Sequence, residues 1–150
     1  MTTRILFVCL GNICRSPTAE AVFRALSVGY DVHIDSCGTS NWHVGEPAYG
    51  PMQAQAQARG YDLSPLRARQ LCTADFTQFD MIIAMDRDNL KDIEACQPKG
   101  STAQLHLMSS FAPNAGFVDM PDPYYTRNFD QVVDFTELAA RGVLDYIPAQ

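Results

Sequence analysis

The sequence lacks an excess of positive charge, because 17 acidic residues oppose 11 lysines and arginines and the net charge is −6. This balance argues against an extended nucleic-acid footprint and against binding to an anionic membrane, although a small basic pocket is compatible with it. No apolar run is long enough for a signal peptide or a membrane span. We therefore expect a cytoplasmic protein with no membrane partner and no nucleic-acid partner.

The sequence also lacks the motifs of common metal and nucleotide sites. His33, His43 and His106 are isolated from one another, so no zinc site is predicted. The pattern G-x-x-x-x-G-K-[ST] of a nucleotide P-loop is absent. We therefore expect neither a metal nor a cofactor. The cysteines number five, and this odd count in a cytosolic setting predicts free thiols rather than a disulfide framework.

What is present is an alternation of strand-like and helix-like segments. A short continuous apolar run, typical of a strand covered on both faces, lies at residues 5–8, and further strand-like segments lie at residues 32–36, 81–85 and 105–108. Helical patterns lie between and after them, at residues 17–26, 51–59, 73–79, 86–95 and from 129 onward. This order predicts one α/β domain over residues 1–150, with a four-stranded parallel sheet and helices on both faces.

Local signals predict where some helices begin. Ser16 is expected to be the N-cap of the first helix, with Pro17 at its first position. Asn128 and Gln131 form a plausible capping box for the last helix. Gly142 lies inside that helix and is expected to weaken it by about 1 kcal/mol relative to alanine.

The most informative stretch is VCLGNICRSPTAE, Val8 to Glu20. It follows the first strand, and ligands of parallel sheets bind at the carboxyl ends of strands. Its backbone N–H groups, together with the start of a helix, can form a nest for an anion. Gly11 and Asn12 tolerate the backbone such a nest needs. Arg15 can grip two oxygens of a phosphate-like group.

These residue types predict an activated nucleophile beneath a cradle for a tetrahedral oxyanion. Cys9 would attack phosphorus while Arg15 and the loop amides stabilise charge on the other oxygens. Water would then hydrolyse the phosphocysteine, and Ser16 could donate a hydrogen bond to the departing sulfur. Phosphate, sulfate and vanadate are expected to bind the same loop. A lone cysteine at a strand end, however, is often a small buried hydrophobe.

Such a reaction also needs a proton donor for the leaving group, and Asp122 in MPDPYY is the best candidate. A plain proline turn is the alternative interpretation of this segment. Tyr124, Tyr125 and Trp42 could wall a slot for a flat aromatic ring, which Leu10 and Ile13 could close. Trp42 could equally belong to the core.

The stretch VCLGNICRSPTAEAVFR together with DPYY closely resembles the low molecular weight protein tyrosine phosphatases. The similarity runs over nearly the whole chain and includes IDSCGTSNWHVG, LRARQL and FTQFDMIIAMDRDNL in family order. It implies hydrolysis of phosphotyrosine in proteins without a metal or cofactor. It also implies Cys9 as nucleophile, Arg15 as phosphate clamp and Asp122 as general acid.

The resemblance implies supporting roles for further residues. Ser16 would hydrogen-bond the thiolate, Asn12 and Ser36 would hold the loop in shape, and Asp86 would be the acidic residue near the arginine. Cys14 resembles a neighbouring cysteine that forms a reversible disulfide with Cys9 under peroxide, although it could also be a loop thiol with no role. Such a disulfide would block activity and spare the nucleophile from irreversible oxidation.

One departure concerns the supporting network. Many relatives carry a histidine where this chain has Leu66, and leucine cannot donate a hydrogen bond. Asn12 and Ser36 must therefore find other partners.

Two other functions are compatible with a cysteine in such a loop. A thiol-dependent arsenate reductase would need further cysteines placed to relay a disulfide, and Cys72 and Cys96 lack paired spacing. A non-enzymatic carrier that holds phosphate on cysteine would need no proton donor such as Asp122. Both are weaker interpretations than the phosphatase.

Overall fold

The central strand of the sheet, β1 (Thr3–Cys9), contains the apolar run Ile5 to Val8, whose residues are fully buried. In the computed structural model, which describes residues 1–148, β1 pairs in parallel with β2 (Val32–Gly38) and with β3 (Met81–Ala84). A fourth strand, β4 (Gln104–Leu107), pairs in parallel with β3. The sheet has the order β2-β1-β3-β4, and the predicted fold class is confirmed.

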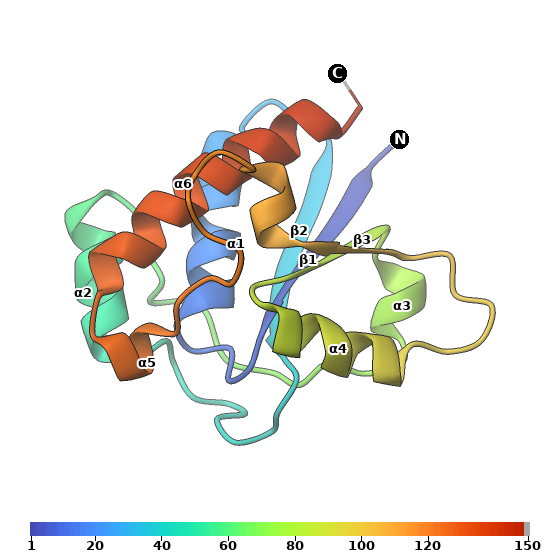
Figure 1. Ribbon diagram of the computed structural model, residues 1–150, viewed down its shortest axis with the longest axis horizontal. Coiled ribbons are helices and arrows are strands. Elements are labelled where there is room, and N and C mark those ends of the chain that lie inside the picture. Colours follow the sequence, from blue (N-terminus) through green and yellow to red (C-terminus); the bar gives the residue numbers. More distant parts are fainter. Residues whose placement is uncertain (149–150) are drawn as a thin grey trace.

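Helices cover both faces of this sheet (Figure 1). One layer contains α1 (Arg15–Leu26), α2 (Gly50–Ala58) and α6 (Phe129–Tyr146), and the other contains α3 (Asp75–Gln78) and α4 (Arg87–Cys96). Successive residues of β1 point into opposite layers, as the pleat of a strand requires. Phe7 packs in the α1 and α6 layer, whereas Leu6 packs in the α3 and α4 layer.

The predicted strands and helices differ from the observed ones by a few residues at their ends. The β2 strand runs two residues further than predicted, to Gly38, and Met108 begins a short 3-10 helix, η1 (Met108–Phe111), instead of ending β4. The short helix α5 (Pro123–Thr126) was not predicted within the proline-rich loop. Asp122 at its N-cap and Pro123 at its first position were the available signals.

The prediction that Ser16 is the N-cap of α1 is wrong. The helix begins at Arg15, and Cys14 occupies the cap position without a side-chain cap hydrogen bond. Ser16 lies inside the first turn and is fully buried, with its hydroxyl near the side chains of Cys9 and Asn12. The hydroxyl is therefore engaged in the site and not in capping.

The last helix, α6, shows how tertiary packing modifies a local rule. Its predicted cap is present, because the Asn128 side chain accepts a hydrogen bond from the Gln131 N–H at 3.1 Å. Gly142 faces the carbonyl oxygen of Phe111 so closely that any Cβ would clash with it. The missing side chain thus permits α6 to approach η1, which offsets the poor helix propensity of glycine.

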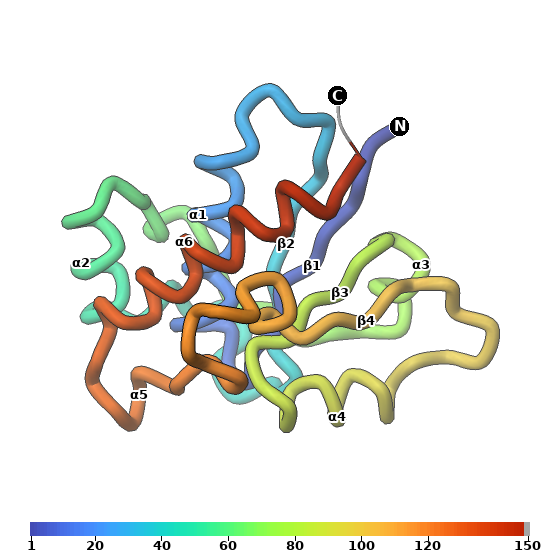
Figure 2. The backbone as a smooth tube through the Cα atoms, turned by 45° about the horizontal axis from the view of Figure 1, so that its top comes forward, coloured from blue at the N-terminus to red at the C-terminus, as the bar shows by residue number. Residues whose placement is uncertain are grey.

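The carboxyl edge of the sheet brings two loops together. The β1 strand ends at Cys9 opposite Gly38, where β2 ends. A Cβ on Gly38 would lie 2.7 Å from the Leu10 carbonyl oxygen, so only glycine permits this approach. The start of β1 and the end of α6 lie side by side at the other end of the molecule (Figure 2). Within residues 1–148, no helix is long and apolar enough to cross a bilayer.

Candidate active site

The loop between β1 and α1, residues 10–14, forms the floor of the candidate site. The Thr39 N–H donates to the Cys9 carbonyl at 2.9 Å, and the Ser40 N–H donates to the Leu10 carbonyl at 3.0 Å. Asn12 has a φ of 57°, in the left-handed region that asparagine tolerates better than most residues. The backbone of the loop is therefore fixed by the start of the next loop and by an uncommon turn at Asn12.

The sulfur of Cys9 lies in a polar environment at the base of this loop. The residue is only 3% exposed. Its Sγ lies 3.0 Å from the Ser16 hydroxyl and accepts a hydrogen bond from the Asn12 backbone N–H at 3.2 Å. The sulfur is therefore held between two polar neighbours at the floor of the pocket.

Arg15 lies in the first turn of α1 and is as buried as Cys9, at 3% exposure. Its Nη1 donates to an Asp86 carboxylate oxygen at 2.6 Å and to the Met120 carbonyl at 3.0 Å. Burial alone lowers the pKa of Arg15, but the Cys9 sulfur, Asp86 and Asp122 raise it above the ordinary value. The guanidinium is therefore a permanent positive charge held at the site.

Two carboxylates face this guanidinium and differ in their surroundings. Asp86 is the N-cap of α4, and its second oxygen accepts a hydrogen bond from the Asn89 N–H at 2.7 Å. Asp122 lies 3.6 Å from the Arg15 Nη2 and also caps α5 by accepting from the Tyr124 N–H. The Asp122 side chain is 27% exposed, so it can meet a bound molecule, whereas Asp86 is committed to holding Arg15.

A pocket of about 250 Å³ opens above Cys9. It brings together the three residues predicted to be catalytic and all five predicted to form a substrate pocket. Its lining residues are Cys9, Leu10, Gly11, Ile13, Cys14, Arg15, Trp42, His43, Asp122, Tyr124 and Tyr125. Trp42 is 68% exposed, which excludes the alternative that it belongs to the core. The pocket therefore has a polar floor and an aromatic rim.

The aromatic rim is held in place by Tyr49, the N-cap residue of α2. Tyr124 packs against Tyr49 with ring centroids 5.3 Å apart and meets Tyr125 edge to face at 5.5 Å. Arg127, which has a left-handed φ of 61°, donates to the Tyr49 hydroxyl at 2.9 Å and lies over its ring. These contacts fix Tyr124 on one side of the pocket and leave Tyr125 exposed.

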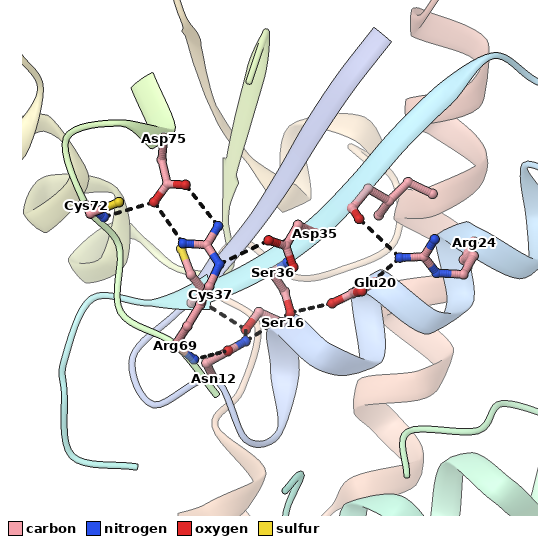
Figure 3. A network of polar contacts seen from close by, with 11 residues as sticks. Asn12, Ser16, Glu20, Arg24, Asp35, Ser36, Cys37, Arg69, Cys72 and Asp75 are labelled. Carbon is pink, nitrogen blue, oxygen red and sulfur yellow. Dashed lines mark hydrogen bonds and ion pairs between the residues drawn. The ribbon is translucent and has the colours of Figure 1, made fainter. Parts of the chain in front are cut away.

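Beneath the loop, Asn12 is the centre of a buried polar network (Figure 3). Its side-chain amide donates to the hydroxyls of Ser16 at 2.7 Å and Ser36 at 3.0 Å, and its carbonyl oxygen accepts from the Arg69 N–H at 3.0 Å. Leu66, whose side chain has no hydrogen-bond donor, is half-buried against the core. The Ser36 hydroxyl instead donates to Glu20 at 2.7 Å.

Cys14 occupies the N-cap position of α1 and lines the same pocket as Cys9. Burial, and then the nearby Cys9 sulfur, raise the pKa of the Cys14 thiol to about 12. Cys14 is therefore a protonated thiol at neutral pH. Cys9, the last residue of β1, lines the same pocket.

Two residues of the site were missed by sequence reasoning. His43 lines the pocket, stacks over Gly11 and has its Nδ1 2.6 Å from a Glu46 carboxylate oxygen. Glu20 is a buried member of the network. Among residues 1–148, no group of three histidine, cysteine or acidic residues is placed to hold a metal ion.

A buried cysteine and a buried arginine lie beside a partly exposed carboxylate at the carboxyl edge of a parallel sheet, an arrangement suited to binding a phosphate-like anion. Comparison with known families agrees, since residues 4–150 match the family described as low molecular weight phosphotyrosine protein phosphatase. The chain therefore belongs to this family of hydrolases.

Individual relatives cover nearly all of the chain. A low molecular weight phosphotyrosine protein phosphatase of Schizosaccharomyces pombe is 42% identical over 89% of this chain and 92% of its own length. The crystal structure of YfkJ from Bacillus subtilis has a TM-score of 0.91 at 35% identity and covers 98% of this chain and 95% of its own. A protein tyrosine phosphatase of Entamoeba histolytica, with Hepes in its active site, has a TM-score of 0.90 at 34% identity and 95% coverage of both chains.

Proposed function

We propose that this enzyme hydrolyses phosphotyrosine in proteins through a phosphocysteine on Cys9. The observation that carries the proposal is the convergence of the Cys9 sulfur, the Arg15 guanidinium and the Asp122 carboxylate on one pocket. The aromatic rim formed by Trp42 and Tyr125 fits the ring of a phosphotyrosine better than a small aliphatic ester. The family assignment supports the same substrate class.

In the first step, the Cys9 thiolate attacks phosphorus in line with the tyrosine oxygen. A P–S bond forms as the P–O bond to tyrosine breaks, and protonated Asp122 transfers its proton to the leaving oxygen. Arg15 and the loop N–H groups donate hydrogen bonds to the remaining phosphoryl oxygens and stabilise their negative charge. The products of this step are free tyrosine side chain, a phosphocysteine and the Asp122 carboxylate.

In the second step, water attacks the phosphocysteine and releases inorganic phosphate. The Asp122 carboxylate takes a proton from that water while the P–S bond breaks, so the acid and the thiolate are both regenerated. The Ser16 hydroxyl, 3.0 Å from the sulfur, stabilises the departing thiolate. Asn12 and Ser36 keep the loop in shape, and Asp86 keeps Arg15 aimed at the phosphoryl group.

The same cradle is proposed to bind inorganic phosphate, sulfate and vanadate as competitive anions. The ligand in the active site of the Entamoeba structure, Hepes, carries a sulfonate and supports an anion site at this position. We further propose a cytoplasmic enzyme, because free thiols such as those of Cys9 and Cys14 persist in a reducing compartment.

Cys14 is proposed as the redox partner of Cys9. Hydrogen peroxide would oxidise the Cys9 thiolate to a sulfenic acid, which the Cys14 thiol would attack with loss of water to give a disulfide. A low-molecular-weight thiol would reduce this bond. The raised pKa of Cys14, about 12, keeps its sulfur protonated, so that peroxide reacts first at Cys9.

The direct test measures turnover of p-nitrophenyl phosphate in EDTA, for the wild type, Cys9→Ser, Asp122→Ala and the control Cys96→Ser. We expect metal-independent turnover that falls by more than about a thousandfold in Cys9→Ser. Cys96 is an exposed thiol on α4, so Cys96→Ser should match the wild type. Equal activity of Cys9→Ser and the wild type would overturn the proposal.

The same samples separate the weaker interpretations. Arsenate-dependent disulfide formation with little ester turnover would indicate a reductase. A stable phosphocysteine, released only to an acceptor protein, would indicate a carrier. Substrate class is tested with peptides that carry phosphotyrosine, phosphoserine or phosphoarginine, and the phosphotyrosine peptide should have the highest kcat/KM.

A further inference from the structure

Glu20 is a buried carboxylate to which the proposed mechanism assigns no role. It lies on α1, one turn beyond Ser16, and is 5% exposed. One of its oxygens accepts from the Ser36 hydroxyl at 2.7 Å, and the other accepts from the Arg24 guanidinium at 2.9 Å. A carboxylate can only accept hydrogen bonds, and a buried one needs such partners. Glu20 therefore dictates the direction of any hydrogen bond made to it.

The direction of the hydrogen bond to Glu20 also determines the direction of the hydrogen bond between Ser36 and Asn12. A serine hydroxyl has one hydrogen, and the hydrogen of Ser36 is directed at Glu20. Ser36 must then act as the acceptor in its contact with the Asn12 amide nitrogen, at 3.0 Å. The side chain of Asn12 is thereby oriented with its NH2 group toward the two serines (Figure 3).

A second arm fixes the other end of the same amide. The Asn12 carbonyl oxygen accepts from the Arg69 backbone N–H at 3.0 Å. The Arg69 side chain is bound in turn by Asp35 at 3.0 Å and by Asp75 at 2.9 Å, which holds this segment across the loop. A reversed Asn12 amide would set two donors against each other, so both arms favour one orientation.

The last hydrogen bond in this series joins the Ser16 hydroxyl to the Cys9 sulfur. Because Ser16 accepts the second hydrogen of the Asn12 amide, its own hydrogen is free for a different partner. The candidate acceptors are the Cys9 sulfur at 3.0 Å and the Cys37 carbonyl at 3.3 Å. When Cys9 is a thiolate it cannot donate, so the shorter contact becomes a hydrogen bond from Ser16 to sulfur.

We propose that Glu20 is a positioning residue for Cys9. Its carboxylate sets the direction of the hydrogen bonds through Ser36 and Asn12, so that Ser16 presents its hydrogen to the nucleophilic sulfur. Leu66 supplies no donor to this network, and Arg24, one turn further along α1, provides the positive charge beside Glu20. The inference rests on the nucleophilic role proposed for Cys9.

The first test is Glu20→Gln, which keeps the size of the side chain and removes its purely accepting character. The cationic Arg24 will hold the amide oxygen, so the new NH2 group will face Ser36 and displace the serine hydrogen. We expect alkylation of Cys9 by iodoacetate at a fixed pH near neutrality to slow about threefold to tenfold, the worth of one hydrogen bond. We expect kcat to fall by a similar factor with KM nearly unchanged.

The matched control is Glu94→Gln, the same change at an exposed position of α4. It should leave the alkylation rate, kcat and KM within about twofold of the wild type. Thermal unfolding and phosphate binding report folding separately, which distinguishes a directional role from a merely stabilising one. Alkylation needs no phosphate ester, so it tests this inference even if the phosphocysteine proposal fails.

The second test is a double-mutant cycle with Ser36→Ala. This change removes the hydroxyl that connects Glu20 to Asn12 and leaves the charge of Glu20 in place. Because Glu20 acts through Ser36, Glu20→Gln should cause no further slowing of alkylation in the Ser36→Ala background. Ser36→Ala alone also keeps the inference testable if Glu20→Gln does not fold. A wild-type alkylation rate in either folded single variant, or losses that multiply in the double variant, would overturn the proposal.

Discussion

The two halves of the active site are held by different kinds of contact. Cys9 and Arg15, which flank the loop between β1 and α1, are each 3% exposed, and polar side chains beneath this loop form a continuous network. The segment that contains Asp122 is attached by its ion pair with Arg15, by two hydrogen bonds from arginines and by tilted and edge-to-face tyrosine contacts, and Tyr125 is 74% exposed. Buried polar groups must be paired, so the anion-binding half is the more rigid one.

This difference separates two tasks. Every phosphate monoester presents the same dianion, and a rigid cradle suits a constant group. Leaving groups differ between substrates, and an open segment with aromatic side chains can accommodate them. Changes in the Cys9 loop should therefore affect all esters alike, whereas changes near Asp122 should depend on the leaving group.

The largest effect is expected from Arg15→Lys. Lysine keeps the positive charge but cannot reach Asp86, Met120 and a phosphoryl group with one planar fork. We expect kcat/KM to fall about a hundredfold to a thousandfold for every ester, by analogy with loss of an oxyanion donor. The control Arg87→Lys changes an exposed arginine paired with Asp119 and should stay near the wild type. A loss confined to one ester would contradict the comparison.

A smaller and more selective effect is expected from Asp122→Asn. Asparagine retains the cap to the Tyr124 N–H but has no proton to transfer. Turnover of a phosphotyrosine peptide should fall about a hundredfold or more. The loss for p-nitrophenyl phosphate should be at least about tenfold smaller, since its leaving group needs less protonation. Equal losses for both esters would show that Asp122 is not the proton donor.

Tyr125→Ala tests whether the segment near Asp122 recognises the aromatic ring of the substrate. Tyr125 lines the rim of the pocket and is 74% exposed. We expect KM for aryl phosphates to rise about threefold to tenfold, the size of a typical aromatic contact, with kcat little changed. Glycerol phosphate, which has no ring, serves as the internal control. A similar rise in KM for that ester would argue against ring recognition by Tyr125.

The smallest effect concerns stability at alkaline pH. Burial raises the pKa of the Cys14 thiol from 9.0 to about 12, so above about pH 9 the unfolded chain loses a proton that the folded chain retains. Stability contributed by this group is present below that pH and is lost as pH rises. Cys14→Ala should thus lose less stability between about pH 8 and pH 10 in urea unfolding. Exposed Cys96→Ala should show the wild-type slope.

Much of this architecture could be predicted from local sequence. The apolar run Ile5 to Val8 and the glycine-containing loop after it predicted that Cys9 lies at the carboxyl edge of the sheet, where β1 ends. Ser16 shows the limit, because a serine before proline satisfies the capping rule equally well. Only the fold reveals that the Ser16 hydroxyl meets Cys9 and Asn12.

The burial of Glu20 could not be predicted from the sequence. A glutamate in an amphipathic helix is ordinarily exposed, and nothing nearby in sequence indicates a buried partner. Its partner Ser36 lies on a strand 16 residues away. Likewise, His43 was isolated in sequence, and it joins the pocket only because its loop crosses Gly11. Such contacts follow from tertiary structure and have no local signal.

The most direct measurement is to quench the enzyme with acid during turnover of a phosphotyrosine peptide and locate the covalent phosphate by mass spectrometry. The account predicts one added phosphoryl group on the peptide that contains Cys9, more of it in Asp122→Asn with a good leaving group, and none in Cys9→Ser. Phosphate found on another side chain, or continued turnover by Cys9→Ser, would contradict it.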